Sequence, residues 1–284
     1  MGFTRDGVRF LLHCQARGVD FSDCATIGRQ GLHLSASELR DAFARHGKPL
    51  SQADADLVFR TASHYAEPLL FRLGAASVDS FDASSYESAT FIADFNEPLP
   101  DTHKARYTVV IDGGSLEHVF NYPQALRNAM EMVRPGGHLV LITPTHSRSG
   151  HGFYQLSPEL FFRALCDDNG YNPPELVIGG STRDRWYRVP DPASVGGRVL
   201  INSKLYSDHL FVVARRQRVT PIFTVWPQQS DYTAAWMRPN ELHLPIAGVK
   251  GYFRANRQRI PRSLLRLYHA VFRSGSGRLP QIDL

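Results

Sequence analysis

Residues that can exchange protons follow directly on an apolar run in the middle of the chain. The segment YTVVIDGGSLEHVFN covers residues 107–121, and its β-branched run ends on Asp112 and a pair of glycines. Glu117 and His118 come next, where we expect a helix to begin. A carboxylate, or an imidazole with a reference pKa of about 6.5, can accept a proton near neutral pH. These residue types and their spacing indicate proton transfer or ligand binding beside a close turn of the backbone.

A second polar segment, PTHSRSGHGFYQLSPE, follows the next apolar run. His151 lies there between two glycines, as expected for a loop of defined shape, and Tyr154 and Gln155 offer polar groups to a substrate. A hydroxyl that reacts as a nucleophile must lose its proton, and a nearby imidazole can take it. We expect His151 to be this base ahead of His118, with Glu117 as an orienting partner or a metal ligand. The alternative for His118 is a helix-start residue that is hydrogen-bonded to the backbone.

The elements that precede these segments must position them. Seven short runs are rich in β-branched and apolar residues, and helical patterns at about 123–133 and 157–168 separate several of them. The runs cover residues 23–28, 76–81, 89–94, 107–112, 138–143, 175–180 and 209–215. Runs that are apolar throughout and alternate with helices are typical of parallel strands buried on both faces. The sequence therefore predicts the α/β class, as a doubly wound, Rossmann-like, mostly parallel seven-stranded sheet with helices on both faces.

Two further helices are expected early in the chain. Ser35 stands three residues before Glu38, which is the spacing of a capping box, and Gly47 is a good helix terminator. Ser51 is a second serine cap, and it opens a segment whose apolar residues recur at helical intervals. These signals predict one helix that ends at Gly47 and another that begins at Ser51.

In a doubly wound sheet, ligands bind beyond the carboxyl ends of the strands, where the strand order changes direction. Carboxylates follow three of the predicted strands, and crowding them together is costly unless a ligand or water uses them. The residues at the strand ends, with the loop after the first strand, are Gly28, Arg29, Gln30, Asp82, Asp94, Phe95, Asn96, Asp112 and Gly113. Any one aspartate has an alternative as a helix cap or turn former. As a set, these residues predict a ligand site. The hydroxyls and the amine of an adenosine could donate hydrogen bonds to its carboxylates.

From Ala76 to about Leu165 the sequence resembles the class I S-adenosylmethionine-dependent methyltransferases. The matching segments are VDSFDAS, ATFIADFNEPLP, YTVVIDGGSLEHV and MVRPGGHLVLITP. The last two are fairly specific in combination and in this order. The close resemblance covers about a third of the chain, and the order of the strands extends it to roughly residues 20–216.

The resemblance implies S-adenosylmethionine as the cofactor and a role for each matching residue. Asp82 would accept hydrogen bonds from the ribose hydroxyls, with Asp79 as the alternative. Asp94 would meet the adenine amine, and Phe95 and Asn96 would shape the adenine slot.

The same resemblance places Asp112 and Gly113 beneath the methionine portion and the departing methyl group. The family normally follows its first strand with an acid and a glycine-rich loop, whereas this chain has ATIGRQGLHLS. Gly28 still allows the backbone to approach a ligand closely, but Arg29 and Gln30 stand where the acid and a glycine are expected. Arg29 either pairs with the carboxylate of the cofactor or points away from it.

The composition is typical of a globular protein, because 43% of the 284 residues are hydrophobic. No apolar run is long enough to span a membrane, and the segment MGFTRDGVRFLLHCQARG is not a secretory signal. Cys14, Cys24 and Cys166 form no close pair, and we interpret them as buried reduced thiols rather than catalytic groups. These features predict a cytoplasmic protein.

We expect a methyltransferase-like domain over residues 1–216, with an insertion at about 181–208 that forms a lid over the acceptor. The insertion contains Trp186, Tyr187 and Tyr206, for each of which core or edge packing is an equal alternative. Residues 217–284 are expected to be a C-terminal extension, first aromatic and then basic and helical. Its aromatic part either completes the acceptor pocket or packs against a second copy of the chain. Much of the net charge of +5 lies in its basic part, and a solvated helix is favoured over nucleic-acid binding because no nucleic-acid motif accompanies the charge.

The expected function is transfer of a methyl group from S-adenosylmethionine to a hydroxyl of a small polar acceptor such as a saccharide. The alternative is a binding or scaffold protein that keeps the fold without turnover, which the altered first loop favours. A dinucleotide-dependent oxidoreductase is disfavoured because no G-x-G-x-x-G follows the first strand. No close His/Cys spacing indicates a metal, although a divalent ion is compatible with Asp112, Glu117 or His118.

Overall fold

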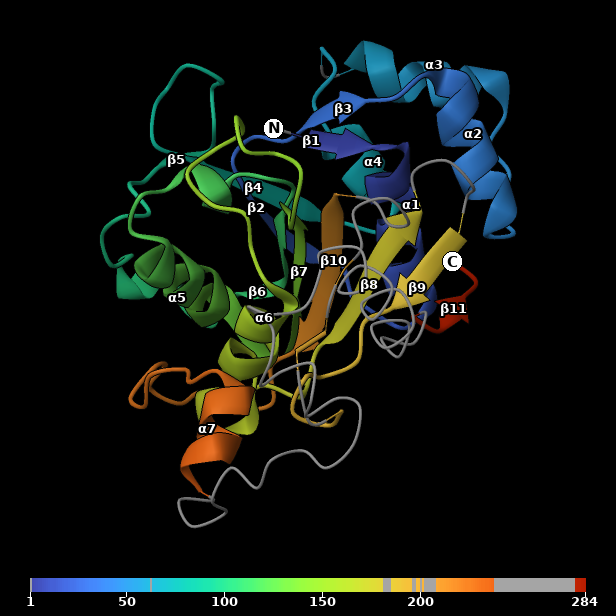
Figure 1. Cartoon of the computed structure of the whole chain (residues 1–284). Coiled ribbons are helices and arrows are strands. Elements are labelled where there is room, and N and C mark those ends of the chain that lie inside the picture. The colour runs from blue at the N-terminus through green and yellow to red at the C-terminus, as the bar shows by residue number, and fades with distance from the viewer. Residues whose placement is uncertain are drawn as a thin grey trace.

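The structure is a computed structural model that describes residues 2–61, 63–180, 185–195, 198–199, 201, 208–237 and 279–284. Nine strands form one sheet in the order β11-β9-β8-β10-β7-β6-β2-β4-β5. Figure 1 shows this sheet running through the centre, from β5 on the left to β11 on the right. Its strands are β2 (Asp23–Ile27), β4 (Ser77–Asp82), β5 (Phe91–Ile92), β6 (Tyr107–Asp112), β7 (Val133–Pro144), β8 (Glu175–Gly180), β9 (Arg185–Arg188), β10 (His209–Arg215) and β11 (Gln281–Ile282). All seven predicted strands are therefore confirmed.

The directions of the strands divide the sheet into two parts. β5, β4, β2, β6 and β7 are paired in parallel. β10 is antiparallel to both of its neighbours, β7 and β8. β8 therefore runs in the same direction as β7, and only β10 opposes the other six predicted strands. The mostly parallel α/β class is confirmed.

The prediction of seven strands is wrong at one edge, where the sheet continues through β9 and β11. Both strands pair antiparallel with their neighbours. β9 lies in the segment predicted as a lid, and β11 lies in the predicted C-terminal extension. Neither has the all-apolar run of a strand buried on both faces, since β9 reads RWYR and β11 is only two residues long. The guanidinium of Arg9 donates to the carbonyl of Leu284 at 2.9 Å and ties this edge to the first helix.

Helices cover both faces of the sheet (Figure 1). They are α1 (Arg5–Ala16), α2 (Ala36–Arg45), α3 (Gln52–Thr61), α4 (Glu67–Arg72), α5 (Tyr122–Met132), α6 (Pro158–Ala164) and α7 (Ser230–Trp236). Successive side chains of a strand point to opposite faces, so Val109 and Ile111 of β6 share a core with α1, α2 and α4, while Val110 shares the other core with α5 and α6. Among the described residues, no helix has both the length and the apolar character needed to cross a membrane.

The signals for the early helices are confirmed. The Ser35 hydroxyl accepts from the N–H of Glu38 at 3.2 Å, and the Glu38 carboxylate accepts from the N–H of Ser35 at 2.8 Å, which completes the capping box. Gly47 follows the end of α2 with φ 69°, in the left-handed region that glycine adopts without strain. Ser51 precedes α3, and its hydroxyl accepts from the N–H of Asp54 at 3.1 Å.

A small two-stranded sheet, which we did not predict, lies over the carboxyl end of β6. β1 (Gly2–Thr4) pairs in parallel with β3 (Gly31–His33). The backbone N–H of Gly2 donates to the carbonyl of Gly113 at 3.2 Å. Figure 1 shows β1 and β3 at the end of the molecule toward which the parallel strands point. The N-terminal residues are therefore part of the edge where a ligand is expected.

Trp186, for which a lid and core packing were both open, is a core residue. Its side chain is 2% exposed, and its ring lies 4.9 Å from the ring of Phe211 and 5.5 Å from the guanidinium carbon of Arg9. Core packing, the alternative for this residue, therefore holds. Tyr206 and the basic segment 251–278 lie outside the described residues.

The three cysteine thiols are predicted to differ in reactivity. Cys14 and Cys24 are fully buried, which raises the pKa of both thiols, and only the thiolate is a good nucleophile. Cys166 is only partly buried. We expect Ellman's reagent to titrate one thiol in the native protein and all three in guanidinium chloride, with Cys166→Ser removing the native signal. Rapid reaction of a second thiol in the native protein would contradict this packing.

Candidate functional site

The ends of neighbouring strands enclose a hollow of about 200 Å³, which we call the strand-end hollow. Its walls come from the ends of β2, β4 and β5 and from the turn after β6. The predicted site residues that line it are Gly28, Asp82, Asp94, Phe95, Asn96 and His118. Residues from four separate predicted segments are therefore brought together at one place.

Gly28 and Asp82 follow a pair of residues that are matched in register, Ile27 of β2 and Phe81 of β4. Gly28 donates its N–H to the carbonyl of Phe81 at 2.6 Å and has φ 73°, so the turn requires glycine. Asp82 accepts a hydrogen bond from the N–H of Ser84 at 3.2 Å. The backbone at Gly28 and the carboxylate of Asp82 therefore lie on adjacent walls of the hollow.

Asp79, the alternative acid on β4, has other partners. Its Oδ2 accepts from the guanidinium of Arg106 at 3.0 Å and from the hydroxyl of Tyr107 at 2.9 Å. Asp79 does not line the strand-end hollow. Of these two acids, Asp82 is therefore the one that can meet a ligand there.

Asp94, Phe95 and Asn96 form a turn that closes the other side of the hollow. The Asp94 carboxylate accepts from the backbone N–H of Asn96 at 2.9 Å and from its side-chain amide at 2.7 Å, which lowers the pKa of Asp94. Asn96 Oδ1 in turn accepts from the N–H of Asn121, just before α5, at 2.9 Å. Phe95 is 4% exposed and lies edge-on to Phe81 at 6.3 Å, so the wall between the polar groups is apolar.

The loop after β2 directs its two unusual residues away from the strand-end hollow. Arg29 donates to the carboxylate of Glu67 at 2.6 Å and to the carbonyl of Glu87 at 2.9 Å, and its guanidinium carbon lies 4.0 Å from the ring centre of Tyr65. Gln30 is buried, and its amide donates to the carbonyl of Ile27 and to the Ser115 hydroxyl. Neither side chain lines this hollow.

Protein atoms fill the side of Gly113 on which a Cβ atom would lie. A Cβ atom added at Gly113 would lie 2.5 Å from Oε1 of Gln30 and 2.8 Å from Cε1 of Phe3. Asp112 is 1% exposed, its Oδ1 accepts from the N–H of Ser115 at 2.8 Å, and burial raises the pKa of its carboxyl. Neither Asp112 nor Gly113 lines the strand-end hollow. Their contact with a cofactor stays a prediction that would need Gln30 and Phe3 to move.

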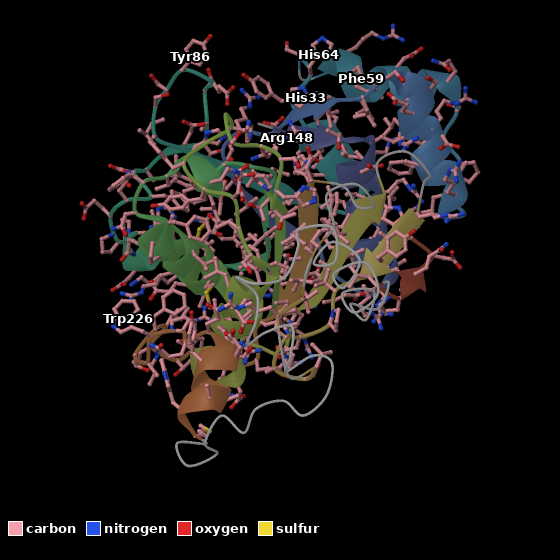
Figure 2. All side chains as sticks on the ribbon, in the orientation of Figure 1. His33, Phe59, His64, Tyr86, Arg148 and Trp226 are labelled. Atoms are coloured by element: carbon pink, nitrogen blue, oxygen red, sulfur yellow. The ribbon has the colours of Figure 1, made fainter. Side chains whose placement is uncertain are left out.

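A second hollow of about 440 Å³ lies on the other side of the turn after β6. Gly113, Glu117 and His151 are the predicted residues that line it. The side chains that we did not predict include His33, Arg148, Asp208 and His209. Figure 2 shows His33 and Arg148 close to the N-terminal sheet, at the same end of the molecule.

Arg148 and His209 both contact the carboxylate of Asp208. Arg148 Nε lies 2.5 Å from Oδ2 of Asp208, and Nδ1 of His209 lies 2.7 Å from Oδ1 of the same carboxylate. His209 begins β10 and is paired with Pro144 at the end of β7. The antiparallel direction of β10 is what brings its first residues to the carboxyl ends of the other strands. The sequence predicts a strand here but not its direction, and for this reason we did not predict Asp208 and His209 as site residues.

Glu117, His118 and His151 form a cluster between the two hollows, and we call it the Glu117 cluster. One ligand atom from each lies within 4.8 Å of the others. His151 Nε2 is 3.6 Å from Glu117 Oε1, and the two imidazole rings are 4.8 Å apart. Burial and the neighbouring Asp112 raise the pKa of Glu117, and partial burial and His151 lower the pKa of His118. A lowered pKa favours the neutral imidazole, which is the form that accepts a proton or binds a metal.

The loop that carries His151 is fastened to the backbone of Glu117. The N–H of Phe153 donates to the carbonyl of Glu117 at 2.9 Å. Gly152 has φ 69°, and a Cβ atom added there would lie 3.0 Å from that same carbonyl oxygen. Glycine at this position therefore allows the approach that sets His151 beside Glu117.

Tyr154 and Gln155, predicted as substrate contacts, form hydrogen bonds that hold the same loop. The Tyr154 hydroxyl donates to the carbonyl of Phe120 at 2.7 Å. Gln155 Oε1 accepts from the N–H of Arg148 at 2.9 Å. Neither residue lines the two hollows, so contact with a substrate stays a prediction for both.

No protein-family model matches the chain, and no curated protein matches it either. Among solved structures, it is similar to the N-methyltransferase NodS from Bradyrhizobium japonicum WM9, with a TM-score of 0.38, 11% identity, and coverage of 75% of this chain and 96% of that one. An S-adenosylmethionine-dependent methyltransferase from Thermotoga maritima gives a TM-score of 0.38 at 11% identity, over 74% and 89% of the two chains.

A third similar structure is the 1,6-didemethyltoxoflavin-N1-methyltransferase from Burkholderia thailandensis, with bound 1,6-didemethyltoxoflavin and S-adenosylhomocysteine. Its TM-score is 0.32 at 12% identity, over 75% of this chain and 78% of that one. Because these TM-scores are low, the function proposed for this chain rests on its own strand order and its strand-end hollow.

Gly152 and Gly150 offer a matched test of the loop that carries His151. Gly152→Ala forces a side chain into the left-handed region and against Glu117, and we expect it to lower the free energy of unfolding by about 1–3 kcal/mol. Gly150→Ala meets nothing within 4 Å and should change it by less than about 0.5 kcal/mol. Urea denaturation of both variants measures the difference. Equal effects would show that the loop is not fastened as described.

Proposed function

We propose that the protein transfers a methyl group from S-adenosylmethionine to a hydroxyl of a small polar acceptor, such as a saccharide. One observation carries this proposal. The strand-end hollow collects Gly28, Asp82, Asp94 and Asn96 from the ends of three parallel strands, in a doubly wound sheet whose ligands bind at that edge.

The groups that line this hollow suit an adenosyl group. The Asp82 carboxylate would accept hydrogen bonds from the two ribose hydroxyls, while the close backbone at Gly28 leaves room for the sugar. Asp94 would accept from the adenine amine, and Phe95 with Asn96 would hold the flat ring between an apolar and a polar edge. Hydrogen bonds to charged groups of this kind contribute about 1.5–3 kcal/mol each.

The Glu117 cluster would face the acceptor. When bound, S-adenosylmethionine supplies a methyl group on a sulfonium, which an acceptor oxygen takes in line while the electron pair of the broken bond stays on sulfur. The chain then has to align the acceptor and exclude water. His151 would accept the proton of the hydroxyl, and Glu117 would orient His151 from the buried side.

The second hollow is the proposed place for the acceptor. It adjoins Glu117 and His151, and Asp6, His33, Arg148 and Asp208 give it both donors and acceptors. A hydroxyl-rich molecule has hydrogen-bonding groups on many sides and fits such a wall better than an apolar one does. This mixture of charges supports the choice of a saccharide or a similar polyol.

A second candidate is a binding or scaffold protein that keeps the fold without turnover. The packing at Gly113 favours it, because Gln30 and Phe3 fill the space that the resemblance gives to the methionine portion. In this case the strand-end hollow would hold an adenosine-like ligand or none. Calorimetry separates the two candidates, since only the methyltransferase has to bind the whole cofactor.

Asp82→Ala is predicted to weaken the binding of S-adenosylhomocysteine by about 10- to 100-fold, because it removes the acceptor of the ribose hydroxyls. Asp79→Ala is the matched control on the same strand. Asp79 faces Arg106 and Tyr107 instead, so its loss should leave the affinity within about twofold. Isothermal titration calorimetry measures both variants. Absence of heat and of a thermal shift with the unaltered protein would overturn the cofactor assignment.

His151→Ala is predicted to spare the binding of S-adenosylhomocysteine while lowering turnover by about 10²–10⁴, the range for loss of a general base. Turnover is measured as release of S-adenosylhomocysteine with a panel of saccharides and polyols. His146→Ala removes another imidazole of the same loop, outside the Glu117 cluster, and serves as the control. Normal turnover of His151→Ala would make His118 the preferred base.

A further inference from the structure

We propose that the Glu117 cluster binds one divalent transition-metal cation between the two hollows. Its ligands would be the carboxylate of Glu117 and one imidazole nitrogen from each of His118 and His151. No metal-ligand spacing is visible in the sequence, because Glu117 and His151 lie far apart in the chain and only the fastened loop brings them together.

The three side chains already converge on one point. Each contributes an atom that lies within 4.8 Å of the other two. Glu117 Oε1 and His151 Nε2 are 3.6 Å apart. Around a tetrahedral zinc ion with bonds of about 2.1 Å, neighbouring ligand atoms are about 3.4 Å apart. Small rotations of the two exposed imidazoles would therefore complete the geometry.

The carboxyl group of Glu117 lacks the hydrogen-bond partners that a buried polar group requires. Its side chain is 1% exposed, and its Oε2 has no hydrogen-bond partner among the residues that the structure describes. Its Oε1 is beyond hydrogen-bonding distance of His151 Nε2. Asp112 is also 1% exposed, and its Oδ2 likewise has no partner within the described part of the chain. A cation at the cluster would be a partner for the buried Glu117 oxygens and would favour the ionised form of this carboxyl group.

The donor set selects the class of cation. Imidazole nitrogen is a good ligand for zinc, iron, nickel and copper, whereas magnesium and calcium prefer sites made of oxygen. Two histidines and one carboxylate are also few enough to leave coordination positions open. The cluster therefore fits a divalent transition metal that keeps room for an exchangeable ligand.

The Glu117 cluster lies where a ligand bound in either hollow could occupy the free coordination positions of the cation. His118 lines the strand-end hollow, while Glu117 and His151 line the second hollow. Both imidazoles are exposed, so a cation from solution can reach the site. A ligand held in either hollow would lie next to the cation.

The catalytic role of this cation rests on the proposed function, whereas its binding does not. A divalent cation lowers the pKa of an oxygen that coordinates it. An acceptor hydroxyl in the second hollow would then release its proton to water. In the cation-bound protein His151 would be a ligand of the cation, so water would take the proton that His151 would accept in the metal-free protein.

The site is tested on full-length protein stripped with a chelator. Zn²⁺ is titrated by calorimetry, and Co²⁺ is followed by its visible absorption, which reports coordination by nitrogen and oxygen ligands. We expect one cation per chain, and we expect His118→Ala and His151→Ala each to weaken the affinity by about tenfold or more. Glu117→Gln keeps the shape of the side chain and should have an effect at least as large. His146→Ala should leave the affinity within about twofold.

Three results would overturn the cation site. They are no binding at one cation per chain, unchanged affinity in His118→Ala and His151→Ala, or an equal loss in His146→Ala, which marks adsorption to surface imidazoles. If Glu117→Gln does not fold, the two histidine variants decide, because their side chains are exposed. S-adenosylhomocysteine is titrated into the same metal-free protein. Failure of that titration would overturn the cofactor assignment alone, and failure of the metal titration would overturn the cation site alone.

Discussion

Parallel pairing of β2 with a strand on each side is the interaction on which the candidate site depends. Ile27 is paired with Phe81 in β4 and with Asp112 in β6. The register of these pairs is fixed by burial, because a slip of one residue would turn every side chain of the strand to the other face. The carboxyl ends of β2, β4 and β6 therefore lie at the same edge of the sheet. Strand pairing alone brings Gly28 and Asp82 together there.

The strands and the acids at their ends could be predicted because both obey local rules. A strand buried on both faces is apolar throughout, as β6 is, so it is visible in the sequence. The residue that follows such a strand, as Gly28 follows β2, is then placed at the ligand edge by topology alone. The edge strands β9 and β11 lack that pattern, and the direction of β10 is set by tertiary pairing, so these features and the second hollow that Asp208 and His209 line escaped prediction.

Side-chain packing around Gly113 could not be predicted, since it joins three separate parts of the chain. Phe3 comes from the N-terminal strand, and Gln30 comes from the loop after β2. Neither residue has a sequence pattern that indicates a contact with Gly113. Only the pairing of β1 with β3 brings both side chains over the end of β6. The Glu117 cluster has the same character. His151 was identified as a candidate from its flanking glycines, but its distance to Glu117 depends on the backbone hydrogen bond from Phe153.

The contacts of Arg9 have a consequence for the order in which the protein folds. Its guanidinium lies against Trp186 in β9 and donates to the carbonyl of Leu284, 275 positions away along the chain. Closing a loop of this length costs entropy before any contact repays it, and folding slows as the mean separation of contacting residues rises. We expect the nucleus of folding to lie in the parallel strands around β2, with the outer edge of the sheet docking onto them afterwards.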